Sequence, residues 1–129
     1  LVRQAEAAVE PAAGTNGTFS RWWECFDCGQ NFHGAVALAL GWACWKTYLG
    51  LPESAWLRCA GLGTLGGALS ESRRLEEALA ALEATVALKQ RHFSRDVRTV
   101  LVTQSDLANC LAQLERHEEA LVLRREIYA

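Results

Sequence analysis

Methionine is absent from this chain, and neither sign of charge dominates it. The chain opens on Leu1, so we expect either a mature form or a piece of a longer protein. A formal net charge of −2 leaves no basic field that would attract nucleic acid, and nucleic acid is therefore not an expected partner. Arginines do cluster after position 58, but glutamates alternate with them, a pattern typical of solvated helix faces.

A long apolar run is also missing. The most apolar stretch, Gly34–Leu51, is too short to cross a membrane and contains Lys46, so we predict a buried helix there. The first residues, "LVRQAEAAVEP", are amphipathic and do not resemble a signal peptide. Five scattered cysteines, an odd number, argue against a secreted disulfide scaffold. We expect a reducing intracellular compartment, the cytoplasm before an organelle.

Residue sets that carry catalysis are missing too. The sequence has no discernible Ser-His-Asp set, paired-carboxylate cleft or phosphate loop. The glycine-rich stretch "GLGTLGG" at 61–67 lies within a predicted helix and follows no strand, so it is not a dinucleotide fingerprint. We therefore expect no enzymatic activity and no cofactor, with zinc the single exception if further ligands exist.

What the chain has is helical patterning in two parts. All five tryptophans lie between residues 22 and 56, whereas most paired charges follow Pro52, which breaks the preceding helix. We divide the chain into an N-terminal part, 1–51, and a C-terminal part, 52–129. Trp42, Trp45 and Leu49 share one helix face and are predicted to be core. The predicted helices span about 2–10, 34–49, 53–71, 75–91, 96–113 and 117–129, and no strand pattern persists.

The C-terminal part contains an internal repeat. "TLGGALSESRRLEEALAAL" at 64–82 aligns without a gap with "DLANCLAQLERHEEALVLR" at 106–124, an offset of 42 residues. Leu65 matches Leu107, and Glu77-Ala78 matches Glu119-Ala120. A fixed period of this size, with a helix pair in each unit, indicates an α-solenoid.

Small and large residues alternate in this repeat as close helix packing requires. Gly66 and Ala108 are small where the first helix of each unit approaches the second, and Ala78 and Ala120 are their counterparts. Leucines at equivalent positions supply the apolar seam. The two units, about 53–91 and 96–129, are predicted to stack in register.

The pattern L-[GA]-x-x-L followed by R-x-E-E-A-L resembles the tetratricopeptide repeat (TPR), in the 42-residue form of kinesin light chains. The resemblance covers about residues 55–129 and implies an all-α fold of antiparallel helix pairs, stacked as a short TPR-like α-solenoid. A small Cys-containing loop segment precedes it on the N-terminal side. Leu69 and Leu111 stand where this family usually has an aromatic residue, and Ser105-Asp106 replaces its paired asparagines.

The resemblance implies a non-enzymatic protein–protein interaction module, because the first helices of such repeats line a concave groove for a peptide or helix. Asn109 and Gln113 are suited to bind a peptide backbone, since the side-chain amide of each donates and accepts hydrogen bonds. Carried over by position, the groove residues are Ala60, Gly63, Gly67, Ser70 and Glu71 in the first unit and Val102, Ser105, Asn109, Ala112 and Gln113 in the second.

The segment "RWWECFDCGQNFHG" at 21–34 holds a C-x-x-C pair, Cys25 and Cys28, followed by His33. Two thiolates form half of a tetrahedral zinc site, but position 38, where a knuckle needs a cysteine, is Leu38. A redox site would need a βαβ context, which is absent from the pattern. Two buried thiols are the third interpretation. We expect Cys25 and Cys28 to lie close together on a turn and to bind zinc weakly or not at all in this chain.

A tryptophan ahead of C-x-x-C, then a short segment and a helix, resembles the closing part of a RING-variant zinc finger over about residues 1–50. Algal and other protist proteins join such a finger to kinesin-light-chain-like repeats. The resemblance implies that Cys25 and Cys28 would be the last ligand pair. It opens an alternative function, a fragment of a ubiquitin ligase whose repeats select substrate. A structural subunit of a larger assembly is the remaining alternative. In every case the expected partner is a protein or peptide.

Overall fold

The computed structural model describes Val2, Phe19, residues 22–25 and residues 28–128. This part of the chain is all-helical, as predicted. Apart from Val2, the helix predicted at 2–10 lies outside the described residues. The helices are α3 (Gly34–Tyr48), α4 (Trp56–Glu71), α5 (Leu75–His92), α6 (Val97–Gln113) and α7 (His117–Tyr128).

Two details of the predicted helices are wrong. The helix predicted at about 53–71 was expected to begin at residue 53, but residues 52–55 form a turn in which the Ala55 amide donates to the Pro52 carbonyl at 2.9 Å, and α4 begins at Trp56. Leu49 was expected to share a buried face with Trp42 and Trp45. Those two indoles do pack against the core, but α3 ends at Tyr48 and leaves Leu49 exposed as its C-cap.

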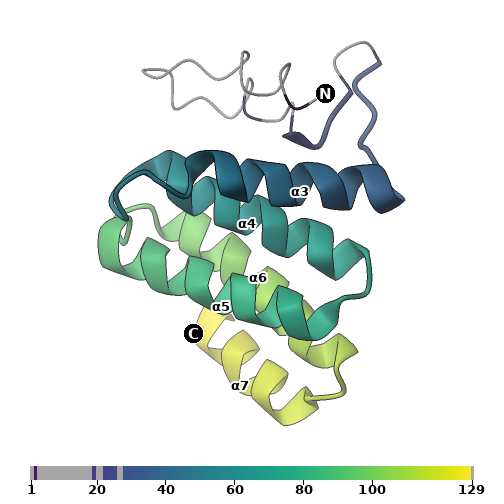
Figure 1. The fold of residues 1–129 in the computed structure, drawn as a ribbon. Helices are drawn as coiled ribbons and strands as arrows, with labels where there is room; N and C mark the ends of the chain where they lie inside the picture. The colour runs from purple at the N-terminus through teal and green to yellow at the C-terminus, as the bar shows by residue number, and fades with distance from the viewer. Residues whose placement is uncertain (1, 3–18, 20–21, 26–27, 129) are drawn as a thin grey trace.

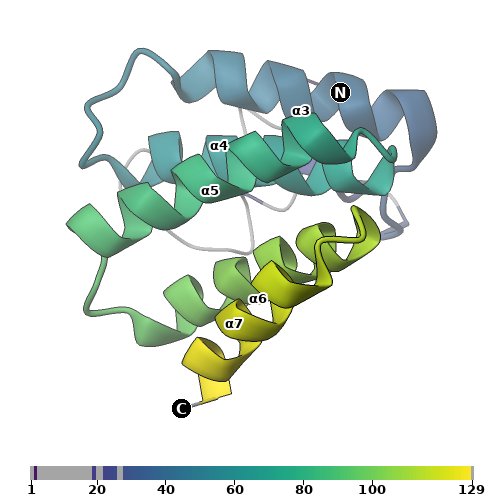
Figure 2. The same ribbon diagram turned by 90° about the horizontal axis from the view of Figure 1, so that it is seen from below.

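The helices stack in chain order. Each packs against the next, α4 also contacts α6, and consecutive helices run in opposite directions (Figure 1). Seen after a 90° turn, α3 and α7 lie at opposite ends of the stack (Figure 2). Within the described residues, no helix combines the length and apolarity needed to cross a membrane. Among the five helices from α3 to α7, α3 makes its main helix contacts with α4 and α7 with α6.

The two turns that end α4 and α6 are built alike. Arg73 and Glu115 both adopt positive φ, 65° and 62°, in the left-handed region that closes helix ends. In each turn the next amide donates back to a leucine carbonyl at 2.9 Å, Arg74 to Leu69 and Arg116 to Leu111. These pairs are 42 residues apart, so the offset read from the sequence is also an offset in backbone geometry.

The main core lies between α4, α5, α6 and α7. Leu65 and Leu107 are both buried in it, as the repeat register predicts, together with Leu69 and Leu111. Gly66 is also buried, and a Cβ built on it would lie 3.0 Å from the Leu82 Cδ2, so α4 and α5 approach closely there. Ala78 and Ala120 are buried at the matching positions of the second helices.

A second, smaller core joins the N-terminal segment to α3. Phe19 and Trp22 are buried against Leu40, Cys44 and Tyr48, and the Trp22 Nε1–H donates to the Tyr48 hydroxyl at 3.2 Å. Because the other side of α3 packs on α4, this helix connects the two cores. The Trp-rich segment is thereby held beside the start of α4, which places it next to the cavities described below.

Candidate functional site

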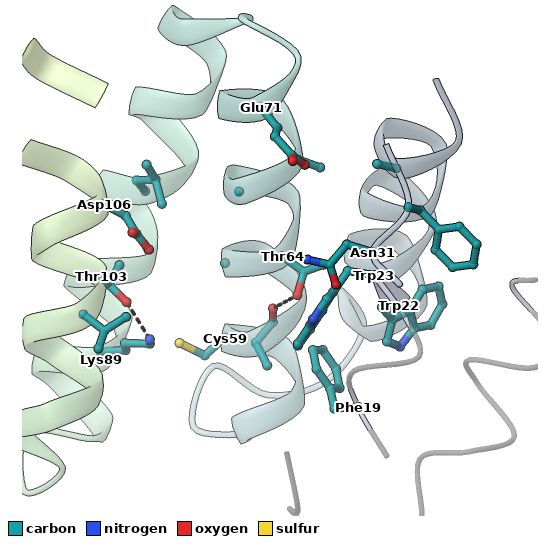
Figure 3. Close-up of a pocket in the computed structure, with 18 of the residues that line it drawn as sticks. Phe19, Trp22, Trp23, Asn31, Cys59, Thr64, Glu71, Lys89, Thr103 and Asp106 are labelled. Carbon is teal, nitrogen blue, oxygen red and sulfur yellow. Dashed lines mark hydrogen bonds between the residues drawn. The ribbon is translucent and has the colours of Figure 1, made fainter. Parts of the chain in front are cut away.

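A cavity of about 510 Å³ lies against α4 and α6, the first helices of the two units. Its floor includes Leu82 and Lys89 of α5, and the N-terminal segment closes one side with Phe19, Trp22, Trp23 and Asn31. Figure 3 shows these side chains converging from helices and from the N-terminal segment. Three parts of the chain that lie far apart in sequence therefore build one site.

A second cavity, of about 390 Å³, continues the first toward the ends of α4 and α6. Both cavities are lined by Gly67, Glu71, Leu82 and Asp106. The second adds the polar side chains of Ser70, Arg73, Asn109 and Gln113. Together they form one groove, which we call the α4–α6 groove, with an apolar half near Trp56 and a polar half near Gln113.

Most residues carried over from the repeat pattern line this groove. They are Ala60, Gly63, Gly67, Ser70 and Glu71 of α4 and Val102, Asn109 and Gln113 of α6. Gly67 faces open space, since a Cβ built on it would meet no atom within 4 Å. The structure thus brings eight of the ten positions together, while their role in binding stays a prediction.

Ser105 and Ala112 line neither cavity. Ala112 packs instead against the main core, and Asp106 occupies the groove position that was assigned to Ser105. The physical reason is the phase of the helix. Successive turns of α6 present Val102, Asp106, Asn109 and Gln113 on one face, and residues 105 and 112 lie to its side.

Lys89 is the principal cation of the apolar half. Its Nζ donates to the Thr103 hydroxyl at 2.6 Å and to the Thr99 carbonyl at 3.3 Å. Burial lowers the pKa of Lys89, and the nearby Cys59, Asp106 and Asp96 oppose that shift. The Lys89 amine and the Cys59 thiol point toward one another (Figure 3). Within the described part of the chain both hydrogen-bond acceptors of this half-buried ammonium are neutral oxygens, and a charged donor of this kind forms strong hydrogen bonds with an acidic ligand group.

Asp106 and Cys59 lie near Lys89; the Cys59 side chain is buried and Asp106 is exposed. Desolvation raises the pKa of the Asp106 carboxyl and of the Cys59 thiol, and Lys89 acts in the opposite direction on both. The described residues offer no carboxylate within salt-bridge distance of Lys89. An acidic group of a ligand would therefore meet an ammonium that has no competing carboxylate from the described part of the chain at this distance.

The apolar half extends past the start of α6. A third cavity, of about 670 Å³, shares Trp23, Trp56, Cys59, Ala60, Lys89 and Val102 with the first and reaches Phe93 and Arg98. Phe19 holds the two indoles from behind, with ring centroids 5.7 Å from Trp23 and 5.4 Å from Trp56. Indoles fixed by packing present apolar surface at a low entropic cost.

The cysteine segment forms a tight turn beside the groove. The Cys25 amide donates to the Gln30 carbonyl at 2.8 Å, and the Gly29 amide donates back to the Cys25 carbonyl at 3.0 Å. Gly29 has φ 73°, a value that favours glycine. An isolated antiparallel bridge pairs Glu24 with Asn31. Cys25 and Cys28 lie on this turn as predicted, and residues 26 and 27 lie outside the described part.

The described residues contain no group of three or more His, Cys, Asp or Glu side chains that could hold a metal ion. His33 is exposed, and its Nδ1 lies 3.5 Å from the Glu71 Oε1 at the rim of the groove. Cys44 is buried in α3, where desolvation raises the pKa of its thiol to about 12 despite a hydrogen bond with Thr64. Neither residue extends the Cys25–Cys28 pair to a zinc site.

Cys44, Cys59 and Cys110 are buried on helix faces. Cys110 Sγ lies 3.3 Å from the Leu75 carbonyl, to which it donates.

Sequence reasoning missed Lys89, Thr103, Asp106 and the two indoles Trp23 and Trp56 as groove residues. Lys89 lies on a second helix, and the repeat pattern assigned the groove to first helices only. Asp106 carried a signal, because Ser105-Asp106 stands where the family has paired asparagines. The indoles had none, because their position depends on how the N-terminal segment folds back.

Comparisons with known proteins bring no relative. No family model, curated protein or solved structure matches the chain significantly.

Proposed function

We propose that this chain is a non-enzymatic protein–protein interaction module, a short TPR-like solenoid whose α4–α6 groove receives a peptide or helix from a partner. The observation that carries the proposal is the assembly of the groove. Positions 42 residues apart in the repeat, Gly67 and Asn109, lie on one continuous surface together with their neighbours. Such first-helix surfaces are the ones with which α-solenoids bind partners.

The chemistry of the groove supports a peptide as ligand. Its apolar half offers Trp23, Trp56 and Val102 for an apolar side chain. Its polar half offers Asn109 and Gln113, whose amides donate to and accept from a peptide backbone. The Asn109 Oδ1 already accepts from the Arg124 Nη2 at 2.9 Å, so Asn109 is oriented by α7.

The test uses a groove-filling variant with a matched control. Gly67→Phe places a ring in the groove where the built Cβ meets no atom within 4 Å, so the fold should be retained. Ala80→Phe adds the same ring at an exposed position of α5, outside the groove. Random twelve-residue peptides displayed on phage are selected against the wild-type chain. Their binding is then measured through the fluorescence of the groove tryptophans.

We expect selected peptides to bind the wild type and Ala80→Phe alike and to lose at least tenfold in affinity for Gly67→Phe. Peptides that bind all three proteins equally would place the binding surface elsewhere. If no peptide is selected, the proposal that the groove reads a peptide fails. Circular dichroism of both variants confirms that the helices are intact.

A further inference from the structure

The outer face of α7 is apolar at its centre and has no helix against it among the described residues. Among the described helices, α7 lies at one end of the stack and makes its main contacts with α6 (Figure 1). Leu121 is 50% exposed, Val122 55% and Tyr128 83%. Ala120 and Leu123 point the other way, into the core. The outer stripe, which we call the α7 face, consists of Glu118, Leu121, Val122, Arg125 and Tyr128.

The repeat shows how two positions of this face are covered elsewhere in the same molecule, while the α5 equivalents of Glu118, Val122 and Arg125 are exposed. Leu79 and Val86 of α5 correspond to Leu121 and Tyr128, and they are only 5% and 8% exposed. α5 lies between two helices, α4 and α6, and packs against both. A helix is therefore the element that fits against this side of the unit.

Differences between the sequences of α5 and α7 indicate which helix packs against the α7 face. At the positions of Ala80 and Glu83 in α5, α7 has Val122 and Arg125. The first change adds apolar surface at the centre of the face. The second replaces a carboxylate by a guanidinium, so that the face carries a basic residue, Arg125, at the other end from the acidic Glu118.

This distribution of charge is self-complementary. Glu118 and Arg125 are seven residues apart on one side of the helix, and the midpoint between them falls between Leu121 and Val122. When a second α7 lies antiparallel across the face about a two-fold axis at this midpoint, each Glu118 meets Arg125 of the second copy. Leu121 then meets the second copy's Val122. A two-fold interface uses the same patch on both copies and makes each such contact twice.

We propose that the α7 face is the contact surface of a homodimer, in which two α7 helices pack antiparallel with Leu121 and Val122 at the centre and Glu118–Arg125 pairs at the ends. The interface is small. One 12-residue helix from each copy buries less than the roughly 1,200 Å² of stable interfaces, so the dimer is weak, with a dissociation constant between about 10 µM and 1 mM. The proposal is independent of the α4–α6 groove, which lies on other helix faces.

Sedimentation equilibrium of the full chain tests the proposal over roughly 10 µM to 1 mM protein, where a weak dimer becomes populated. We expect a monomer–dimer equilibrium that weakens as salt is added, because the end pairs are exposed. Glu118→Arg and Arg125→Glu should each weaken the dimer about tenfold, since each converts two attractive pairs into repulsive ones. The double variant Glu118→Arg/Arg125→Glu should restore it. Leu121→Asp should abolish it.

Glu76→Arg is the matched control, because it makes the same charge change one repeat earlier on α5 and should leave the dimer unchanged. All the substituted side chains are exposed, so circular dichroism should show folded proteins throughout. A chain that stays monomeric over the whole concentration range overturns the proposal. So does a dimer indifferent to Leu121→Asp, or a double variant as weak as the single ones.

Discussion

Two adjacent glycines in α4 offer a sharp test of how its helices pack. A Cβ built on Gly66 would lie 3.0 Å from the Leu82 Cδ2 and 3.2 Å from its Cγ, whereas one on Gly67 would meet nothing within 4 Å. Gly66→Ala and Gly67→Ala therefore make the same chemical change in the same helix. They differ in whether α5 leaves room for the added methyl group.

The magnitudes follow from two opposing terms. Replacing glycine by alanine inside a helix stabilises it by about 0.5–1 kcal/mol, and Gly67→Ala should show this gain alone. Gly66→Ala has the same gain but forces Leu82 to move, and overpacking of this kind costs about 1–3 kcal/mol. The free energies of unfolding of the two variants should thus differ by about 1–3 kcal/mol. This corresponds to roughly 3–6 °C in melting temperature for each kcal/mol at this chain length.

Urea unfolding followed by circular dichroism measures both variants under identical conditions. A double-mutant cycle isolates the contact: in a Leu82→Ala background, Gly66→Ala should become stabilising, as Gly67→Ala is. The second unit shows the same pairing naturally. It has Ala108 at the position of Gly66, and the residue at the position of Leu82 is Arg124. Equal stability of the two single variants would refute the close α4–α5 approach.

Three further outcomes are expected. Ala120→Trp should lower the melting temperature, because its ring does not fit between α6 and α7, where overpacking costs about 1–3 kcal/mol; an unchanged value would contradict the register. Hydrogen bonds from Thr99 lower the pKa of Asp96, the N-cap of α6, so the stability that the Asp96 carboxylate contributes is present above its pKa in the unfolded chain and is lost as pH falls through its pKa in the folded protein. Asp96→Asn, which caps the helix without titrating, should not lose this contribution in acid. Urea midpoints that fall in parallel for the two proteins between neutral and acidic pH would argue against this role of Asp96. The isolated chain should contain less than one equivalent of zinc by elemental analysis; a full equivalent lost together with structure in Cys25→Ser would mean that further ligands join Cys25 and Cys28.

Local sequence determined much of the helical architecture. The helices from α3 to α7 lie close to their predicted ranges, because helix faces and turns are encoded in residues a few positions apart. The 42-residue offset correctly predicted that Leu65 and Leu107 are both buried in the main core. The start of α4 was misplaced because the turn at Pro52 competes locally with the first turn of a helix.

The candidate site was only partly predictable. First-helix positions such as Gly67 and Asn109 followed from the repeat. That Asp106 lines the groove instead of Ser105 depended on the rotation of α6 about its axis. A rotation of this size is set by how α6 packs on α5, so it is a property of the packed helices rather than of the α6 sequence.

By itself the sequence therefore determined the helices, their repeat and most of the groove wall, because each depends on periodic patterns within a unit. Only the tertiary structure decided that Lys89 of a second helix reaches Thr103, and that Trp23 and Trp56 flank the same cavity. It also decided that α7 has an exposed apolar face where α5 has a buried one. These features depend on contacts between segments far apart in the chain, for which a local pattern of residues carries no signal.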